Sequence, residues 1–187
     1  GAVGRDARAC LRGAGPDRAA ADATAEALAA GRDASAADLL ADMRIVYSRL
    51  YLAPGGHTPI FPYESAFLHV ERGMKGVPAL FRTPVTLDVE RLMREAGVVA
   101  KNARKEPCDS VFEEFELLSY LYAKRAGALN GDDAEAGAAW TERSQTFERG
   151  HAQAGLPAFM QRTQELAAEK PYCAFAALAL TVMEVRS

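Results

Sequence analysis

A proline turn leads directly into an amphipathic helix in the stretch Glu106-Pro107-Cys108-Asp109-Ser110-Val111-Phe112-Glu113-Glu114-Phe115-Glu116-Leu117-Leu118-Ser119-Tyr120-Leu121. Pro107 cannot continue a preceding helix, so a new helix has to begin after it. Ser110 with Glu113 three residues later has the pattern of a capping box, and Asp109 adds negative charge near the positive end of the helix dipole. The sequence therefore predicts a helix from Ser110 to Arg125, which ends at Gly127.

Apolar residues recur at helical spacing along most of the chain, and no stretch shows the alternation of a strand. We therefore predict an all-α protein, a single-domain helical bundle of about eight to ten helices over residues 1–187. Besides the helix after Pro107, helices are expected at about 17–30, at 36–52, in a short segment after Tyr63, at 85–96, at 134–152, from Pro157, and from Pro171. The last of these is apolar nearly all round and is expected at the centre.

Glycine, proline and threonine mark the expected helix boundaries. Gly97 is expected to end the helix that Thr86 caps, and Gly155 is expected to separate the helix at 134–152 from the one that Pro157 begins. Because the chain starts without methionine, residues 1–17 are expected to be poorly ordered or left over from cloning.

Composition excludes several classes of protein. With 187 residues, 49% of them hydrophobic, the chain is long enough for one well-buried core. A formal charge of -3 argues against a nucleic-acid-binding protein, and the most apolar run, Tyr172 to Met183, is too short for a membrane span. The three cysteines form no Cys-x-x-Cys pair, which favours reduced thiols in a cytosolic protein.

No motif of catalysis or metal binding occurs. The histidines at 57, 69 and 151 lie on different predicted elements, and the chain has no His-Glu-x-x-His, EF-hand, Gly-x-Gly-x-x-Gly or Walker sequence. Glu113, Glu114 and Glu116 are better explained as a solvated helix face than as a paired-carboxylate or metal site. A Cys108–His151 nucleophile pair is possible in principle, although nothing in the sequence places the two together. We therefore predict a protein that is not an enzyme and holds no metal.

The order of the loops and helix starts resembles one known family. Pro62-Tyr63-Glu64-Ser65-Ala66-Phe67 is followed by a helix that ends in Gly97, by Glu106-Pro107-Cys108-Asp109-Ser110 and Glu114-Phe115-Glu116-Leu117-Leu118, and finally by Phe147, His151, Pro157 and Phe159. This succession, over roughly residues 38–184, is similar to that of the TorD/DmsD/NarJ family of redox-enzyme maturation chaperones. The chain has Ser110 where members commonly carry histidine, and Gly155 where a tryptophan is often found.

The resemblance implies an all-helical cytoplasmic chaperone without catalytic activity. Such a protein binds the apo form of a molybdopterin-containing oxidoreductase subunit through its twin-arginine signal peptide, and assists cofactor insertion and assembly before export. It has no cofactor of its own, and contact with GTP or with the molybdopterin cofactor is implied by the resemblance alone. A monomer or homodimer is expected, without nucleic acid or stable membrane insertion. One alternative is a helical scaffold that binds a mature subunit without its leader, and a weaker one is a guanine-nucleotide-binding protein.

A receptor for such a leader needs an apolar groove beside oxygen acceptors, because arginine binds carboxylates through two parallel hydrogen bonds. Asp109, Glu114 and Glu64 are the candidate acceptors. The candidate peptide-binding residues are Tyr63, Glu64, Ser65, Phe67, Pro107, Asp109, Ser110, Glu114 and His151.

Each of these residues also has a structural alternative. Asp109 and Ser110 can cap their helix, Glu64 can bond loop amides, Tyr63 and Phe67 can belong to the core, and His151 can be a hydrogen-bonded packing residue. If Asp109 contacts the peptide, Asp109→Ala should weaken leader binding and leave the melting temperature nearly unchanged.

Overall fold

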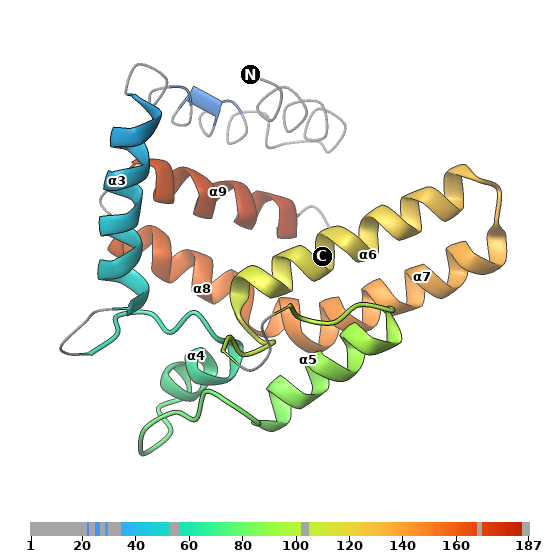
Figure 1. Cartoon of the computed structure of the whole chain (residues 1–187), viewed down its shortest axis with the longest axis horizontal. Helices are drawn as coiled ribbons and strands as arrows, with labels where there is room; N and C mark the ends of the chain where they lie inside the picture. The colour runs from blue at the N-terminus through green and yellow to red at the C-terminus, as the bar shows by residue number, and fades with distance from the viewer. Residues whose placement is uncertain are drawn as a thin grey trace. The chain divides into compact units, whose positions relative to one another are not determined.

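The computed structural model describes residues 22, 25–26, 29, 35–52, 57–101, 105–167 and 170–184. Over these residues all the regular structure is helical, without a strand, so the predicted all-α class is confirmed (Figure 1). The elements are α3 (Ala36–Tyr47), the π-helical segment η2 (Ser48–Leu52), α4 (Glu64–Glu71), α5 (Pro84–Glu95), α6 (Val111–Asn130), α7 (Ala134–Phe147), the π-helical segment η3 (Glu148–Ala152), α8 (Gln153–Leu166) and α9 (Lys170–Glu184).

The described ranges thus hold seven α-helices, fewer than the eight to ten expected for the whole chain. Most of the helix predicted at 17–30, and all of residues 1–17, lie outside the described residues. None of the helices in these ranges combines the length and apolar character that a membrane span needs.

The chain divides into two compact units, Gly1–Ile60 with Pro157–Ser187, and Phe61–Leu156. The single domain over residues 1–187 therefore stays a prediction. We refer to the second unit as the central unit, because it lies between the two segments of the other in sequence.

In the unit formed by the two chain ends, Tyr51 of η2 is the organising side chain. Its ring stacks on Phe159 with a centroid distance of 5.5 Å, and its hydroxyl shares a hydrogen bond of 3.0 Å with Thr163. Burial raises the pKa of Tyr51 to about 12. The prediction that the last helix is central is wrong, since Phe175 and Val182 of α9 are 48% and 39% exposed.

Residues 134–166 form three consecutive helical elements, α7, η3 and α8. The predicted break at Gly155 and new start at Pro157 are therefore wrong, because Pro157 lies inside α8. Proline lacks an N–H and removes one backbone hydrogen bond near the start of α8, where the π-helical turn just before it already changes the hydrogen-bond register. The helix accommodates the proline at this change of register.

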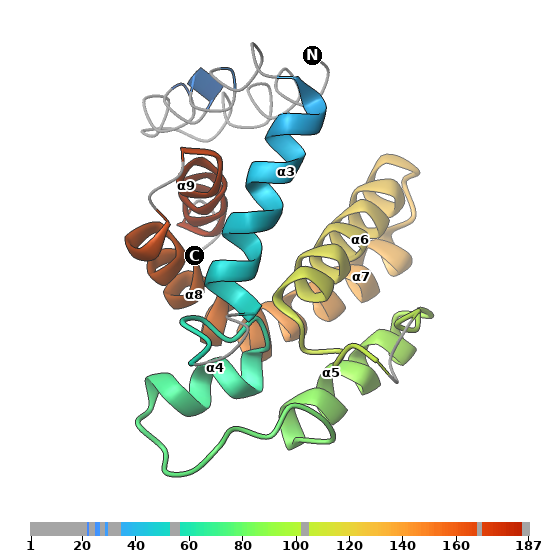
Figure 2. The same cartoon turned by 60° about the vertical axis from the view of Figure 1, so that its left-hand side comes forward.

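In the central unit, α6 and α7 lie side by side as an antiparallel pair (Figure 1; Figure 2). The edge of the Tyr120 ring meets Trp140 at a centroid distance of 6.1 Å. The helix α6 continues past its predicted end at Gly127 and reaches Asn130, with Gly131 at the C-cap. A glycine inside a helix costs only about 1 kcal/mol relative to alanine, which tertiary packing readily outweighs.

Gly97 ends α5 as predicted, with a φ of 78° that favours glycine. The predicted cap of this helix is wrong by one turn. Thr83, not Thr86, accepts the hydrogen bond at the N-terminus, from the Thr86 amide at 3.0 Å, and Pro84 occupies the first turn. The Thr86 hydroxyl is thereby available for a contact outside its own helix.

Candidate functional site

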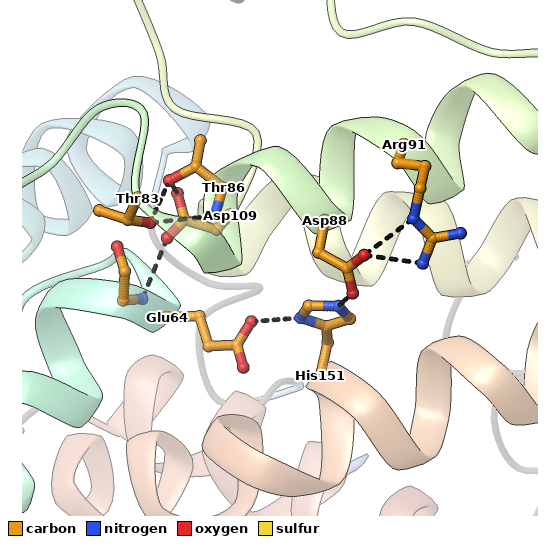
Figure 3. A network of polar contacts seen from close by, with 8 residues as sticks. Glu64, Thr83, Thr86, Asp88, Arg91, Asp109 and His151 are labelled. Atoms are coloured by element: carbon orange, nitrogen blue, oxygen red, sulfur yellow. Dashed lines mark hydrogen bonds and ion pairs between the residues drawn. The ribbon is translucent and has the colours of Figure 1, made fainter.

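Asp109 joins the starts of two helices to the turn before a third (Figure 3). The Ser65 amide, in the first turn of α4, donates to Oδ2 of Asp109 at 3.0 Å, and the Thr86 hydroxyl on α5 donates to Oδ1 at 3.2 Å. The Asp109 carbonyl accepts from the Glu64 amide at 2.8 Å. Asp109 is fully buried. It therefore caps α4, a helix 44 residues earlier in the chain, and not the helix that follows it.

The backbone around Asp109 is bonded to the residues before α4. The Val111 amide donates to the Pro62 carbonyl at 2.9 Å, and Tyr63 and Ser110 form an isolated antiparallel bridge. Ser110 is the N-cap residue of α6, but its side chain makes no capping hydrogen bond, so the predicted capping box with Glu113 is absent. The amide at the start of α6 finds its partner in the Pro62 segment instead.

His151 connects three elements of the same unit (Figure 3). Its Nδ1 lies 2.7 Å from Oε2 of Glu64 on α4, and its Nε2 lies 3.1 Å from Oδ2 of Asp88 on α5. In its doubly protonated form the imidazole ring can donate a hydrogen bond to each of the two carboxylates. Burial lowers the pKa of His151, but the hydrogen bonds and negative charges of Glu64 and Asp88 outweigh it and the pKa is raised. Hydrogen bonds from Arg91 at 2.7 and 2.9 Å lower the pKa of Asp88 and keep this partner ionised.

Glu114 on α6 is buried next to the carboxyl group of Glu64. It is fully buried, and neither of its carboxyl oxygens has a hydrogen-bond partner within the part of the chain described. Burial raises the pKa of Glu114 well above the ordinary value, followed by the negative charge of Glu64, the side-chain interaction with Glu64 and the negative charge of Asp109. The carboxyl is therefore held in its neutral, protonated form.

Replacing Glu114 by leucine is expected to raise the free energy of unfolding by about 1–3 kcal/mol, because it removes a carboxyl group that is fully buried beside the carboxyl group of Glu64. The gain should grow as the pH rises above about 4.5, since the unfolded chain then releases a proton that the folded chain retains. Urea unfolding at about pH 5 and pH 8 measures both effects. The exposed Glu135→Leu variant, as a control, should change stability by less than about 0.5 kcal/mol. A loss of stability at both pH values would show that Glu114 has a stabilising partner.

A groove of about 370 Å³ lies on another face of α6, also within the central unit. Its lining residues are Met93, Val98, Val99, Ala100, Lys101, Glu113, Glu116, Leu117 and Tyr120. Burial raises the pKa of Glu113, and the nearby negative charges of Glu116 and Glu106 raise it further. The three glutamates of α6 thus separate, with Glu114 inside and the other two at the groove.

The model of the protein family described as nitrate reductase delta subunit matches residues 16–161. The chain belongs to this family. No curated protein and no solved structure matches the sequence significantly. The nitrate reductase delta subunit family is one of redox-enzyme maturation chaperones, which confirms the resemblance drawn from the loop order.

In this member of the delta subunit family, the residues predicted for the site lie mostly in the interior. Glu64, Ser65, Asp109 and Ser110 come together around the start of α4, and His151 joins them through Glu64. The side chains of Phe67, Pro107 and Glu114 are buried as well, and Tyr63 is half-buried.

The expectation that Glu64, Asp109 and Glu114 edge an open groove does not hold in this structure, because they are 3%, 0% and 0% exposed. Asp109 accepts hydrogen bonds from the first turns of α4 and α5, and Glu64 contacts His151. Glu114 lies in the core. Their role in binding a peptide stays a prediction. The residues that sequence reasoning missed are Thr83, Thr86 and Asp88 in the network and Met93, Val99 and Tyr120 in the groove. The i, i+3 spacing of Glu113 and Glu116 was the available signal for the groove.

No group of three or more His, Cys, Asp or Glu side chains in the described ranges is arranged to hold a metal ion. Cys108, the thiol considered as a nucleophile, is buried, and burial raises its pKa. A thiol with a raised pKa is a weak nucleophile because little of it is thiolate at neutral pH. In this member of the delta subunit family, the buried Cys108 thiol is therefore poorly suited to nucleophilic catalysis.

Proposed function

We propose that the chain is a cytoplasmic, system-specific chaperone for a molybdopterin-containing oxidoreductase subunit. It binds the apo subunit through its twin-arginine signal peptide and assists cofactor insertion and assembly before export. The observation that carries the proposal is the family match over residues 16–161. The chain acts by binding, as a monomer or homodimer, and has no catalytic activity or cofactor of its own.

The polar network supports a binding role. Contacts of 2.7–3.2 Å from Asp109 and His151 fix the starts of α4 and α5 and the turn before α6. A surface that is already ordered loses little conformational entropy when it binds a partner. We propose that the nine predicted residues act through this frame: they set the shape of the binding surface, and the peptide contacts lie on side chains around them.

The test is a titration of the full chain with a synthetic twin-arginine leader peptide, alongside affinity purification from cell extract. We expect saturable binding of the peptide and recovery of a molybdopterin oxidoreductase precursor. A peptide of the same composition in scrambled order is the control and should bind weakly.

Other outcomes separate the alternatives. Binding of the mature subunit without saturable binding of the leader would support the scaffold hypothesis and contradict leader recognition. A calorimetric titration with GTP and magnesium should give no heat of binding. Recovery of only general chaperone clients would contradict the proposed function itself.

A further inference from the structure

The groove on α6 has an apolar floor and one exposed apolar wall. Met93 and Leu117 are buried beneath it, and Val99 at its side is 77% exposed. Tyr120 is fixed at one end, since its hydroxyl donates to the Ala96 carbonyl at 3.2 Å and its ring meets Trp140. Exposed apolar side chains that gather in a concave surface are typical of a binding site.

Among the described residues that line the groove, negative charges outnumber positive ones. They comprise Glu113, Glu116 and the cation Lys101, and Glu106 lies near enough to raise the pKa of Glu113. Within the described ranges, none of these three glutamates forms an ion pair with a lysine, arginine or histidine. A cationic ligand would relieve the repulsion among them, so the groove is complementary to a positive charge.

We propose that this groove is the docking site for a client segment in which an arginine is flanked by apolar residues. The guanidinium bridges the carboxylates of Glu113 and Glu116 beside the Tyr120 ring, and the neighbouring apolar side chains cover Met93, Leu117 and Val99. The inference rests on the proposed function and locates its contact surface on α6, away from the buried carboxylates of Asp109 and Glu114.

The spacing of the two glutamates favours arginine over lysine. Side chains at i and i+3 are neighbours on a helix surface, with Cβ atoms about 5–6 Å apart. The planar guanidinium presents several N–H donors in a fixed fork and can serve two carboxylates at once, and it also stacks on aromatic rings. A lysine ammonium offers a single charged point and gains less from this geometry.

The test measures the dissociation constant of the twin-arginine leader peptide for the full chain and for charge variants. Glu113→Gln with Glu116→Gln is expected to weaken binding roughly ten- to a hundred-fold, as loss of charge-assisted hydrogen bonds does. Replacing the peptide arginines by lysine should weaken binding to the unmodified chain several-fold and make little further difference in the double variant. The control Glu135→Gln removes an exposed charge on α7 and should leave the constant unchanged.

A photo-crosslinking amino acid at position 99 should attach to the bound peptide, and one at the exposed Leu129 on α6 should not. Circular dichroism confirms that each variant is folded. If the unmodified chain binds the peptide and the double variant binds equally well, the groove is not the docking site and the proposed function stands. If the unmodified chain binds neither leader nor client, both are overturned.

Discussion

Replacing Asp109 by alanine is expected to lower the free energy of unfolding by about 2–5 kcal/mol, because it removes the carboxyl group that accepts hydrogen bonds from the Ser65 amide and the Thr86 hydroxyl. For a chain of this length the melting temperature should fall by roughly 5–15 °C. Thermal and urea unfolding measure the loss. This expectation replaces the one drawn from sequence, in which Asp109→Ala affects binding and hardly affects stability.

Two further variants show whether the burial of this cap matters. Asp109→Asn keeps the shape and one acceptor oxygen of the side chain. Its free energy of unfolding should therefore lie between that of the unmodified chain and that of Asp109→Ala. Asp133 caps α7 through the Ala136 amide at an exposed site, and Asp133→Ala should cost only about 1 kcal/mol. Equal losses for Asp109→Ala and Asp133→Ala would contradict a cap shared between helices.

Replacing His151 by glutamine is expected to lower the free energy of unfolding by about 2–4 kcal/mol at pH 6, because Glu64 then lies buried without its positive partner. The loss should shrink as the pH is raised. The pKa of His151 is raised in the folded chain, so its stabilising contribution is complete below the ordinary value near 6.5 and is lost as the pH rises through the folded value. Urea unfolding across this pH range gives the difference between the two proteins.

Other charged groups near His151 also contribute to the dependence of the free energy of unfolding on pH. Glu64 on α4 and Asp88 on α5 contact the ring, Arg91 holds Asp88, and Glu114 on α6 adjoins Glu64. These groups are present in both proteins, so subtraction of the two profiles largely isolates His151. The exposed His57→Gln variant is the control, and its profile should match that of the unmodified chain. A loss for His151→Gln that does not vary with pH would show that the imidazole is neutral and acts only by packing.

Helix existence was predictable where the apolar spacing is long and regular. The segments 36–52 and 134–152 appear as α3 with η2 and α7 with η3, and the short helix after Tyr63 is α4. Boundaries were less predictable, because proline and glycine act locally whereas packing decides whether a helix continues. In sequence Pro157 looks like the start of a helix and Gly127 like an end, and both lie inside helices in the structure.

The sequence predicted which residues of the candidate site lie close together. It did not predict that they are buried rather than exposed at a surface. Loop order brought Glu64, Asp109 and His151 into one hypothesis, and they do share one network. Sequence does not reveal that Asp109 caps a distant helix, since the pattern of a local cap is the same. Glu114 was misplaced for a different reason: it lies three residues after Val111 and four before Leu118, on the buried face, where a carboxylate is rarely expected.

The cap that Asp109 supplies also bears on how the newly made chain folds. An eight-residue helix such as α4 is marginal by itself, and the side chain of its N-cap residue Tyr63 does not cap it. Ribosomes add about 5–20 residues per second, so the 44 residues that separate Ser65 from Asp109 take several seconds to synthesise. During that interval the Ser65 amide at the start of α4 lacks the Asp109 carboxyl group that caps it. We therefore expect α4 to become stable after the turn before α6 has left the ribosome.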